Sequence, residues 1–484
     1  MAGTGIEMAE LTRKQFGFVI VALAMAELLS TLEAGLVYVA LPTITAKFGS
    51  LGDVSWLVSA FVLVQGGSAA IASRMGDLFG RRRVLVAVLV CCALGSGISA
   101  SSSQLEVVIA GRAIQGVSGA VLPLCYGIIR EVVPAAKVAF WVGILTAVIG
   151  ASGVAAYALG GVLVQYGSWH WIFYATLILP LLTIPLILAF VPFSLPEKQA
   201  QKPDLLGGLL FVPAIAGILL ALTKGATQWG LKSASFLLLF AISAALFVVW
   251  TIHELRHPQP LIDVRLFLNR QVVLANACFA LLGLGQMQLS VVVMLLLQQP
   301  AWTGAGLGVS VSVAGLLSMP GAIGGAMASA YGGWLAARYG SRLAAVAGAT
   351  ILTSAWTGLT VYHATSWSVA LGVLAAGIGS GLIMFAVANL VLEVAPSDRS
   401  SEATGMTFVV RSIFTAIGAQ IAVALLSTVT VANPARVGTD FPADQAYTAA
   451  IGFIAAMSVM MILATLALPR SVRFSAKIAD GPSS

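Results

Sequence analysis

Apolar runs of about 20 residues recur along nearly the whole chain and are separated by short polar segments. A helix of about 20 apolar residues crosses a bilayer, and within lipid it satisfies its own backbone hydrogen bonds. The pattern therefore predicts an all-α membrane protein. We expect fourteen spans, at residues 16–41, 55–73, 84–101, 105–129, 138–163, 171–192, 205–223, 234–253, 272–298, 306–335, 343–362, 367–391, 405–428 and 447–468.

A short charged segment occurs twice. The first copy, S-R-M-G-D-L-F-G-R-R-R at 73–83, follows the second expected span, and a diverged copy, G-W-L-A-A-R-Y-G-S-R at 333–342, follows the tenth. Many secondary transporters are built from such repeats. Two six-span halves would place the copies after spans two and eight, so two extra spans should separate the halves. The predicted parts are a first half (1–204), two inserted helices (205–256) and a second half (257–484).

Composition supports a membrane protein. The chain is 59% apolar and only 9% charged, whereas soluble domains carry about 25% charged residues. The net charge of +7 comes from basic residues in short loops, so we expect a lipid bilayer and no nucleic acid as partner. The four cysteines lie in apolar segments, the four histidines show no zinc spacing, and no Walker loop is present. We therefore expect no metal, no cofactor and no enzymatic activity.

The basic residues predict the orientation. Of the 25 Lys and Arg residues, 19 fall on the side of the N-terminus, 4 on the other side, and 2 within spans. Those on the other side are Lys47, Lys224, Lys232 and Arg436. We therefore place both termini in the cytoplasm and expect the plasma (inner) membrane as the location.

Charged residues inside spans are expensive and usually face a cavity or a partner. Glu33 lies deep in span one, where burial favours the neutral acid, so it is a candidate to take and release a proton; the alternative is a neutral, hydrogen-bonded acid. Glu27 is on a different face of the same helix and is either a second titrating site or a polar helix contact. Arg112 needs an acceptor, for which Glu33, Gln115 or a substrate anion would serve. Arg411 is the intramembrane cation of the second half.

Further polar residues lie within the apolar spans. Tyr157 continues a glycine stripe in span five and either fills a notch or turns its hydroxyl toward a cavity. The remaining candidates either line the cavity or bond to another helix. They are Gln65, Gln115, Tyr126, Asn276, Gln286, Gln288 and Asn389.

The ordered motifs resemble the major facilitator superfamily, in particular its 14-helix drug/proton antiporter branch. The first charged segment resembles the family loop at Asp77, Gly80, Arg81 and Arg82. Three further segments resemble family patterns at the expected depths: L-E-A-G-L-V-Y-V-A-L-P at 32–42, R-A-I-Q-G at 112–116 and W-H-W-I-F at 169–173. Asp204 and Gly207 resemble the opening of span seven.

The resemblance implies a bundle of two six-helix halves plus two extra helices, and a proton-coupled exporter of amphipathic or drug-like small molecules that works by alternating access. It implies proton coupling by Glu33, tuned by Arg112, and a gate at Asp77, Gly80 and Arg81, where arginines bridge to a neighbouring helix end. Gly76 and Gly80 should permit a tight turn there.

Span five departs from the antiporter pattern. Ser152, Ala156 and Tyr157 stand where Gly, Gly and Pro are expected. Two other transport functions therefore remain open: a lipid or fatty-acid translocator and a proton symporter of an organic acid. A non-transporting membrane sensor is the alternative from another class.

Overall fold

The structure is a computed structural model. It describes residues 13–49, 51–193, 204–225, 229–230, 232–257, 264–265, 269–394, 400–434 and 440–468. As expected, it is an all-α bundle; its only strands in the described residues are the two-residue β1 (Thr430–Val431) and β2 (Phe441–Pro442), which pair antiparallel.

The first half of the chain forms long helices joined by short turns. Its elements are α1 (Arg13–Phe48), α2 (Leu51–Val54), α3 (Trp56–Phe79), α4 (Arg81–Ser101), α5 (Leu105–Gln115), the 3₁₀ helix η1 (Gly116–Ala120), α6 (Val121–Val132), α7 (Ala135–Tyr166) and α8 (Trp171–Phe190).

Two helices follow and then the second half. They are α9 (Leu205–Lys224) and α10 (Ala234–Arg256). The second half comprises α11 (Arg270–Leu284), η4 (Gln286–Gln288), α12 (Leu289–Gln298), η5 (Ala301–Thr303), α13 (Val311–Tyr339), α14 (Ser341–Val361), α15 (Ser366–Val394), α16 (Ser400–Leu426) and α17 (Asp444–Ala467).

Twelve stretches of helix in the described part are long and apolar enough to cross a membrane. One combines α5, η1 and α6, and another combines α11, η4 and α12. The helices α3, with 24 residues, and α9, with 20, are not among the twelve but reach a comparable length. A helix lies at each of the fourteen predicted positions, while twelve candidate spans is the count that the structure supports.

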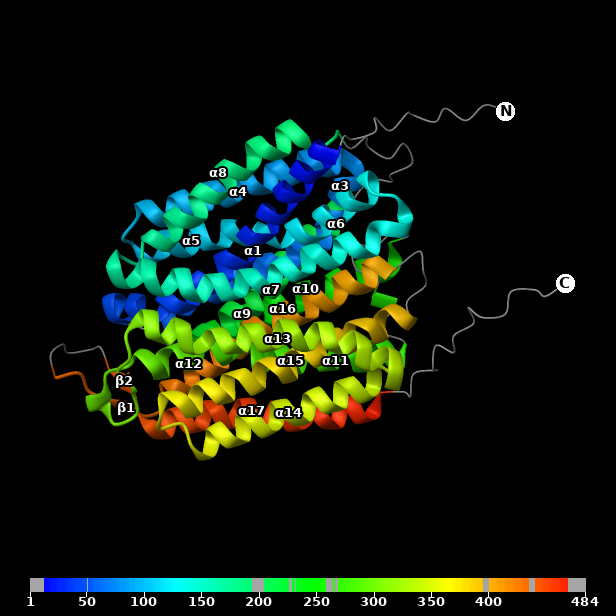
Figure 1. Ribbon diagram of the computed structural model, residues 1–484. Helices are drawn as coiled ribbons and strands as arrows, with labels where there is room; N and C mark the ends of the chain where they lie inside the picture. Colours follow the sequence, from blue (N-terminus) through cyan, green and yellow to red (C-terminus); the bar gives the residue numbers. More distant parts are fainter. Residues whose placement is uncertain are drawn as a thin grey trace, which may run out of the picture.

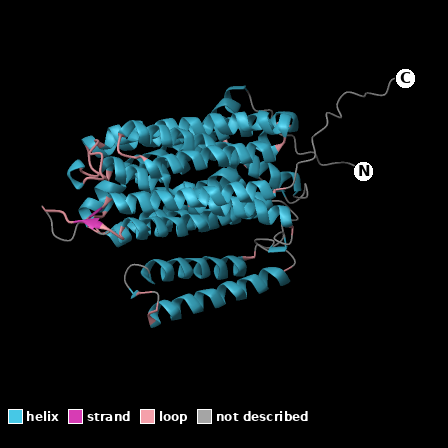
Figure 2. Ribbon diagram, turned by 90° about the horizontal axis from the view of Figure 1, so that it is seen from below, coloured by secondary structure: helices cyan, strands magenta, loops and turns pink. Residues whose placement is uncertain are grey.

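The long helices run side by side (Figure 1). The first helix begins and the last helix ends at the same end of the bundle, which we call the terminal end; β1 and β2 lie at the opposite end, the hairpin end (Figure 1). The pair α9–α10 lies beside the main bundle (Figure 2) and contacts it chiefly through α9, which packs against α3 and α16. The two halves meet mainly along α3 with α16 and α7 with α13.

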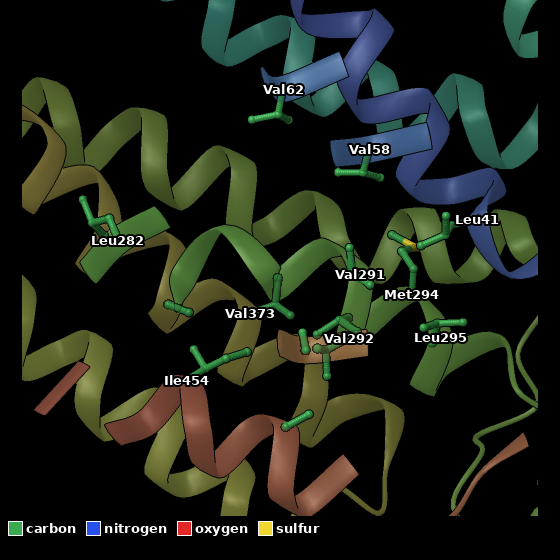
Figure 3. Packing of buried hydrophobic residues seen from close by; sticks show 14 of the residues in the cluster. Leu41, Val58, Val62, Leu282, Val291, Val292, Met294, Leu295, Val373 and Ile454 are labelled. Carbon is green, nitrogen blue, oxygen red and sulfur yellow. The ribbon is translucent and has the colours of Figure 1, made fainter. Parts of the chain in front are cut away.

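The buried apolar core differs between the two ends. The largest cluster joins both halves at the hairpin end, where Leu41 and Val58 of the first half lie near Met294 and Leu295 of α12 (Figure 3). A second cluster runs from Val19 to Val191 and lies wholly in the part of the first half toward the terminal end. Among the described residues, the halves therefore share a core toward the hairpin end, whereas the first half has a core of its own toward the terminal end.

Candidate functional site

Arg112 is the centre of a polar cluster inside the first half. Its side chain is 1% exposed. It donates three hydrogen bonds: from Nε to the Leu57 carbonyl oxygen (3.0 Å), and from Nη1 to the Glu33 carbonyl oxygen (2.9 Å) and to Gln115 Oε1 (2.9 Å). The guanidinium also lies 4.0 Å from the centre of the Phe61 ring. Of the partners considered for Arg112, the structure brings in Gln115 and the backbone, but not the carboxyl, of Glu33.

Gln115 continues this cluster toward two other helices. Its amide nitrogen donates to Ser96 Oγ at 2.6 Å and to Thr176 Oγ1 at 3.3 Å. Arg112 and Gln115 share one face of α5, as their spacing predicted, and α1, α3, α4, α5 and α8 all contribute to the network. Because Gln115 is fully buried, its burial argues against the predicted contact with substrate.

A break in helix α5 accompanies this cluster. The backbone tightens into η1 at Gly116–Ala120, and α3 packs so closely against it that a Cβ at Gly119 would clash with the Gln65 carbonyl oxygen. Hydroxyl groups bond to two η1 carbonyls: Ser68 Oγ donates to Gly116 O (3.1 Å) and Ser30 Oγ to Ser118 O (3.2 Å). The break thus brings η1 against α1 and α3.

The Glu33 carboxyl lies beside this network without being part of it. Its side chain is 1% exposed, and neither carboxyl oxygen has a hydrogen-bond partner among the described residues. Its polar neighbours are Arg112, Ser118 and Cys92. An ionised carboxylate in such a place costs several kcal/mol, on the order of the penalty for a buried unpaired ion. This arrangement therefore accommodates the protonated acid.

Glu27 lies six residues closer to the terminal end of α1. It is also 1% exposed, one of its carboxyl oxygens lacks a hydrogen-bond partner in the described part, and its polar neighbour is Cys125. It is surrounded by the first-half core cluster rather than by the Arg112 network. The two acids are thus in separate environments, in line with their predicted positions on different helix faces.

The predicted gate has a different backbone from the one expected. Helix α3 continues through Gly76 to Phe79, so the turn consists of Gly80 alone, with φ +87°. Asp77 therefore lies in the last turn of α3 and not at the start of the next helix; its side chain is outside the described residues. Arg81 donates to Glu131 Oε1 (2.9 Å) and to the Gly127 carbonyl oxygen (3.0 Å), both in α6. The bridge to a neighbouring helix end is present, and it stays within the first half.

The second half repeats this corner. Gly340 joins α13 to α14 with φ +91°, as Gly80 joins α3 to α4. Two residues later, Arg82 donates to the Leu188 carbonyl oxygen of α8, and Arg342 donates to the Leu466 carbonyl oxygen of α17, each at 2.5 Å. Each arginine thus caps carbonyl groups near the end of the last helix of its own half.

Tyr157 contacts the second half through both its backbone and its hydroxyl group. Its backbone carbonyl packs against Gly315 of α13, and its hydroxyl hydrogen-bonds to Ser290 Oγ of α12 at 2.8 Å. It therefore joins the two halves by a polar contact, while the notch and the cavity stay predictions. Its neighbourhood includes Tyr38 of α1.

The other cavity candidates differ in exposure. Gln286 is 6% exposed and accepts a hydrogen bond from Trp356 Nε1 at 2.7 Å, so it serves packing within the second half. Asn276 is buried and donates to the Val272 carbonyl oxygen, while its own Oδ1 has no partner among the described residues. Gln65 is half-buried on α3. Of these three, Gln65 is therefore the best placed to reach a cavity.

Arg411 differs from Arg112 in its partners. It is half-buried, its guanidinium lies 4.4 Å from the centre of the Phe408 ring, and its Nη1 is 3.7 Å from Met384 Sδ. None of the described carboxylates forms an ion pair with it. It sits on the fifth long helix of its half, whereas Arg112 is on the fourth, so the two are not related by the repeat.

At the hairpin end, the W-H-W segment precedes α8. Trp169 is buried against Phe48 and Phe173, and His170 Nε2 lies 3.2 Å from the Ser102 carbonyl oxygen. Burial lowers the pKa of His170 below its usual value, which favours the neutral ring. The motif therefore packs the start of α8.

Sequence reasoning missed several polar contacts between the halves. Gln420 of α16 donates to Ser59 Oγ at 2.7 Å and accepts from Ser55 Oγ at 3.2 Å. Gln298 donates to the Val39 carbonyl oxygen at 3.1 Å. A glutamine within an apolar span was the available signal at Gln420, but its partner helix could not be read from the sequence.

The expectation of no zinc spacing among the histidines is wrong. His253 and His257 are four residues apart, and the structure places them with Asp204 so that their ligand atoms all lie within 4.8 Å of one another. The predicted span ended at residue 253, whereas α10 continues to Arg256 and brings His257 onto the same face.

Comparisons with known proteins agree with this architecture. The family model described as Major Facilitator Superfamily matches residues 23–419. The MFS-type transporter gkaD of Penicillium citrinum is 32% identical over 336 residues, which are 65% of this chain and 56% of the relative. Multidrug resistance protein 3 of Bacillus subtilis is 28% identical over 313 residues, 64% of this chain and 60% of the relative. The matched regions thus cover less than two thirds of these two relatives.

One further relative matches a longer part of the chain, and solved structures share its fold. Multidrug transporter protein MdtP of Bacillus subtilis is 26% identical over 427 residues, 87% of this chain and 76% of the relative. The peptide transporter POT in complex with sulfate superposes with a TM-score of 0.65 at 14% identity, over 93% of this chain and 94% of that chain. For the human organic anion transporter MFSD10 the TM-score is 0.61 at 15% identity, over 93% and 99%. At such identities, these two structures show the shared fold alone.

Proposed function

The chain belongs to the Major Facilitator Superfamily, a family of transporters and not of enzymes, and on that premise we propose that it is a proton-coupled exporter of amphipathic or drug-like small molecules. Relatives named for multidrug resistance and transport support the substrate class. The observation that carries the coupling is the Glu33 carboxyl, which is buried beside Arg112 and has no hydrogen-bond partner within the described part of the chain.

Protonation of Glu33 would bias the bundle through α1. Loss of the proton creates a buried charge that must gain water or a partner, and a rotation of Arg112 toward it would strain or break the bonds to Leu57, Gln115 and the Glu33 carbonyl. Six residues later, Val39 accepts the Gln298 hydrogen bond from the second half. A shift of α1 would therefore alter this contact between the halves. In this way a proton would change the populations of two access states.

The contacts between the halves favour alternating access. The bonds of Tyr157 with Ser290, Gln420 with Ser55 and Ser59, and Gln298 with Val39 all lie between mid-depth and the hairpin end. Opening at the hairpin end must break them, while the two halves would approach each other toward the terminal end.

We further propose the fourteen-span arrangement of the 14-helix antiporter branch, in which α3 and α9 also cross the bilayer. The first half would be 1–204, the inserted pair 205–256 and the second half 257–484. The terminal end would lie on the cytoplasmic side of the plasma membrane, because basic residues concentrate at that end.

Single cysteines test this orientation. On a background without the native cysteines, Thr365→Cys at the hairpin end should react with an impermeant thiol reagent added to intact cells. Lys137→Cys, exposed at the terminal end, should react only after the cells are opened. Labelling of Lys137→Cys from outside would reverse the orientation.

A second candidate function rests on Arg411. A half-buried cation without a carboxylate partner in the described part suits an anionic substrate. This favours, as the alternative, a fatty-acid translocator or a proton symporter of an organic acid.

Flux into proteoliposomes separates these functions. An antiporter accumulates substrate when the lumen is acidic, and a symporter does so when the outside is acidic. The panel should contain cationic dyes, uncharged drugs, fatty acids and small organic acids. The proposal expects accumulation of a dye or drug with an acidic lumen. Accumulation of an organic acid with an acidic exterior would replace it by symport, and no gradient-dependent flux of any compound would favour a sensor.

A further inference from the structure

A cluster of potential metal ligands lies at the terminal end of the inserted helix pair, away from the Arg112 network. Asp204 directly precedes α9, His253 lies in the last turn of α10, and His257 directly follows that helix. One ligand atom from each of the three lies within 4.8 Å of the other two. No other cluster of this kind occurs among the described residues.

The two histidines have a spacing that suits a metal. Residues four apart lie on one face of a helix, and two histidines at this spacing recur as zinc ligands on helices. The segment reads H-E-L-R-H over 253–257. The two rings are 5.3 Å apart between centroids.

The carboxylate of Asp204 is fixed in place beside them. Its side chain is 2% exposed, and its Oδ1 accepts a hydrogen bond from the Gly207 backbone N–H at 2.8 Å. A Cβ at Gly207 would lie 2.5 Å from Asp204 Oδ2, so the absence of a side chain there leaves room for this carboxylate. His253 Nε2 lies 2.9 Å from each Asp204 oxygen.

We propose that Asp204, His253 and His257 form a binding site for a divalent transition metal of the zinc class. Two imidazoles and one carboxylate match the donors that zinc, nickel and copper accept, whereas magnesium and calcium prefer oxygen alone. A bound zinc ion lies about 2.0–2.2 Å from each of its ligand atoms. Small shifts of the three side chains would bring their ligand atoms to these distances. His253, with 22% of its side chain exposed, gives the ion a route from solvent.

The site serves binding and not hydrolysis. Glu254 occupies the place of the general base in the zinc-peptidase pattern. Here it is 1% exposed and accepts a hydrogen bond from Trp250 Nε1 at 2.9 Å, so it faces the interior of the helix pair. A bound ion would clamp the end of α10 to the start of α9.

Zinc binding to the untagged full-length protein in detergent tests the site. After treatment with a chelator, the protein is titrated with Zn²⁺ against a fluorescent zinc indicator, and with Co²⁺ as a spectroscopic probe. The wild type and the control His363→Gln, whose histidine pairs with Asp444 outside the cluster, should each bind one equivalent. The double variant His253→Gln/His257→Gln should lose affinity by more than the roughly 10–100-fold that the loss of an outer-shell partner costs.

The single variant His257→Gln tests the site even if the double variant fails to fold. It keeps the His253–Asp204 hydrogen bond, so it should fold and still bind zinc more weakly than the wild type. Zinc should raise the unfolding temperature of the wild type and of His363→Gln, but not that of the double variant. Equal zinc affinity in the wild type and His257→Gln, or no saturable binding by the wild type, would overturn the site. The assay requires no transport, so its outcome is independent of the proposed function.

Discussion

Two arginines inside the helical bundle illustrate how partners decide the role of a buried charge. Arg112 donates to three acceptors and stacks on Phe61, whereas Arg411 contacts an aromatic ring and a thioether. The first arrangement holds helices together, and the second leaves a cation able to receive an anionic group. In this conformation Arg112 thus holds helices together, which leaves its proposed part in coupling to a change of partners, and Arg411 remains a candidate for substrate contact.

Replacement of each arginine by methionine should separate these roles. Arg112→Met removes three buried hydrogen bonds from a charged donor, each worth about 1.5–3 kcal/mol. We expect a large drop in the unfolding temperature in detergent for Arg112→Met and a small change for Arg411→Met. Equal losses in the two variants would show that the hydrogen bonds of Arg112 do not carry the difference.

The residues of the site were only partly predictable. Charged residues within apolar runs stand out, so Glu33, Arg112 and Arg411 were found from the sequence. Which atoms they meet was not predictable, because the Arg112 side chain reaches the backbone of α1 only once the helices are assembled. Serine and threonine partners such as Ser96 and Thr176 are common in membrane helices and give no signal of their own.

At the scale of elements, the repeat is visible in the backbone as well as in the sequence. Gly80 and Gly340 both take a positive φ between two helices. At each of these glycines the chain reverses direction within one residue. A residue with a Cβ would be strained in that backbone conformation. The corner is therefore a fixed structural part of each half.

Alanine at the corner should destabilise the protein. Gly80→Ala places a Cβ at φ +87°, a strain of roughly 1–3 kcal/mol. The matched control is Gly97→Ala in α4, where a Cβ meets nothing within 4 Å and helix propensity improves by up to about 1 kcal/mol. Thermal unfolding should show a loss for Gly80→Ala and no loss for Gly97→Ala. A stable Gly80→Ala protein would contradict the strained corner.

Helix positions were predictable because apolar length is a strong signal in membranes, whereas interruptions were not. The predicted spans 105–129 and 272–298 contain the short 3₁₀ helices η1 and η4. These breaks depend on close contact with helices far away in sequence. The same limit applied at the end of α10, where three further helical residues decide whether His257 joins His253.

At the scale of the whole molecule, the two halves are joined toward one end. The shared core and the polar contacts of Tyr157, Gln420 and Gln298 lie between mid-depth and the hairpin end. Under the proposed orientation this conformation is closed to the outside. Transport then requires α7 and α13 to part.

A disulfide between α7 and α13 should stop this motion. A Cβ at Gly153 lies 3.8 Å from the Ala322 Cβ, a spacing close to the mean of about 3.8 Å between disulfide-bonded cysteines. Gly153→Cys/Ala322→Cys should lose flux under oxidising conditions and regain it with a reductant, while each single variant stays active. Full flux in the oxidised double variant, with the cross-link confirmed by mass spectrometry, would show that these helices do not separate during transport.

The central claim is that Glu33 couples a proton to substrate movement. Its most direct test is the flux of a transported compound into proteoliposomes, with and without a pH gradient. Glu33→Gln keeps the shape and neutrality of the protonated acid but cannot release a proton. Gradient-driven accumulation should therefore vanish while substrate binding persists. Glu33→Asp should retain partial activity, and Glu27→Gln should be milder than Glu33→Gln. Full gradient-driven flux in Glu33→Gln would contradict the account and direct attention to Glu27.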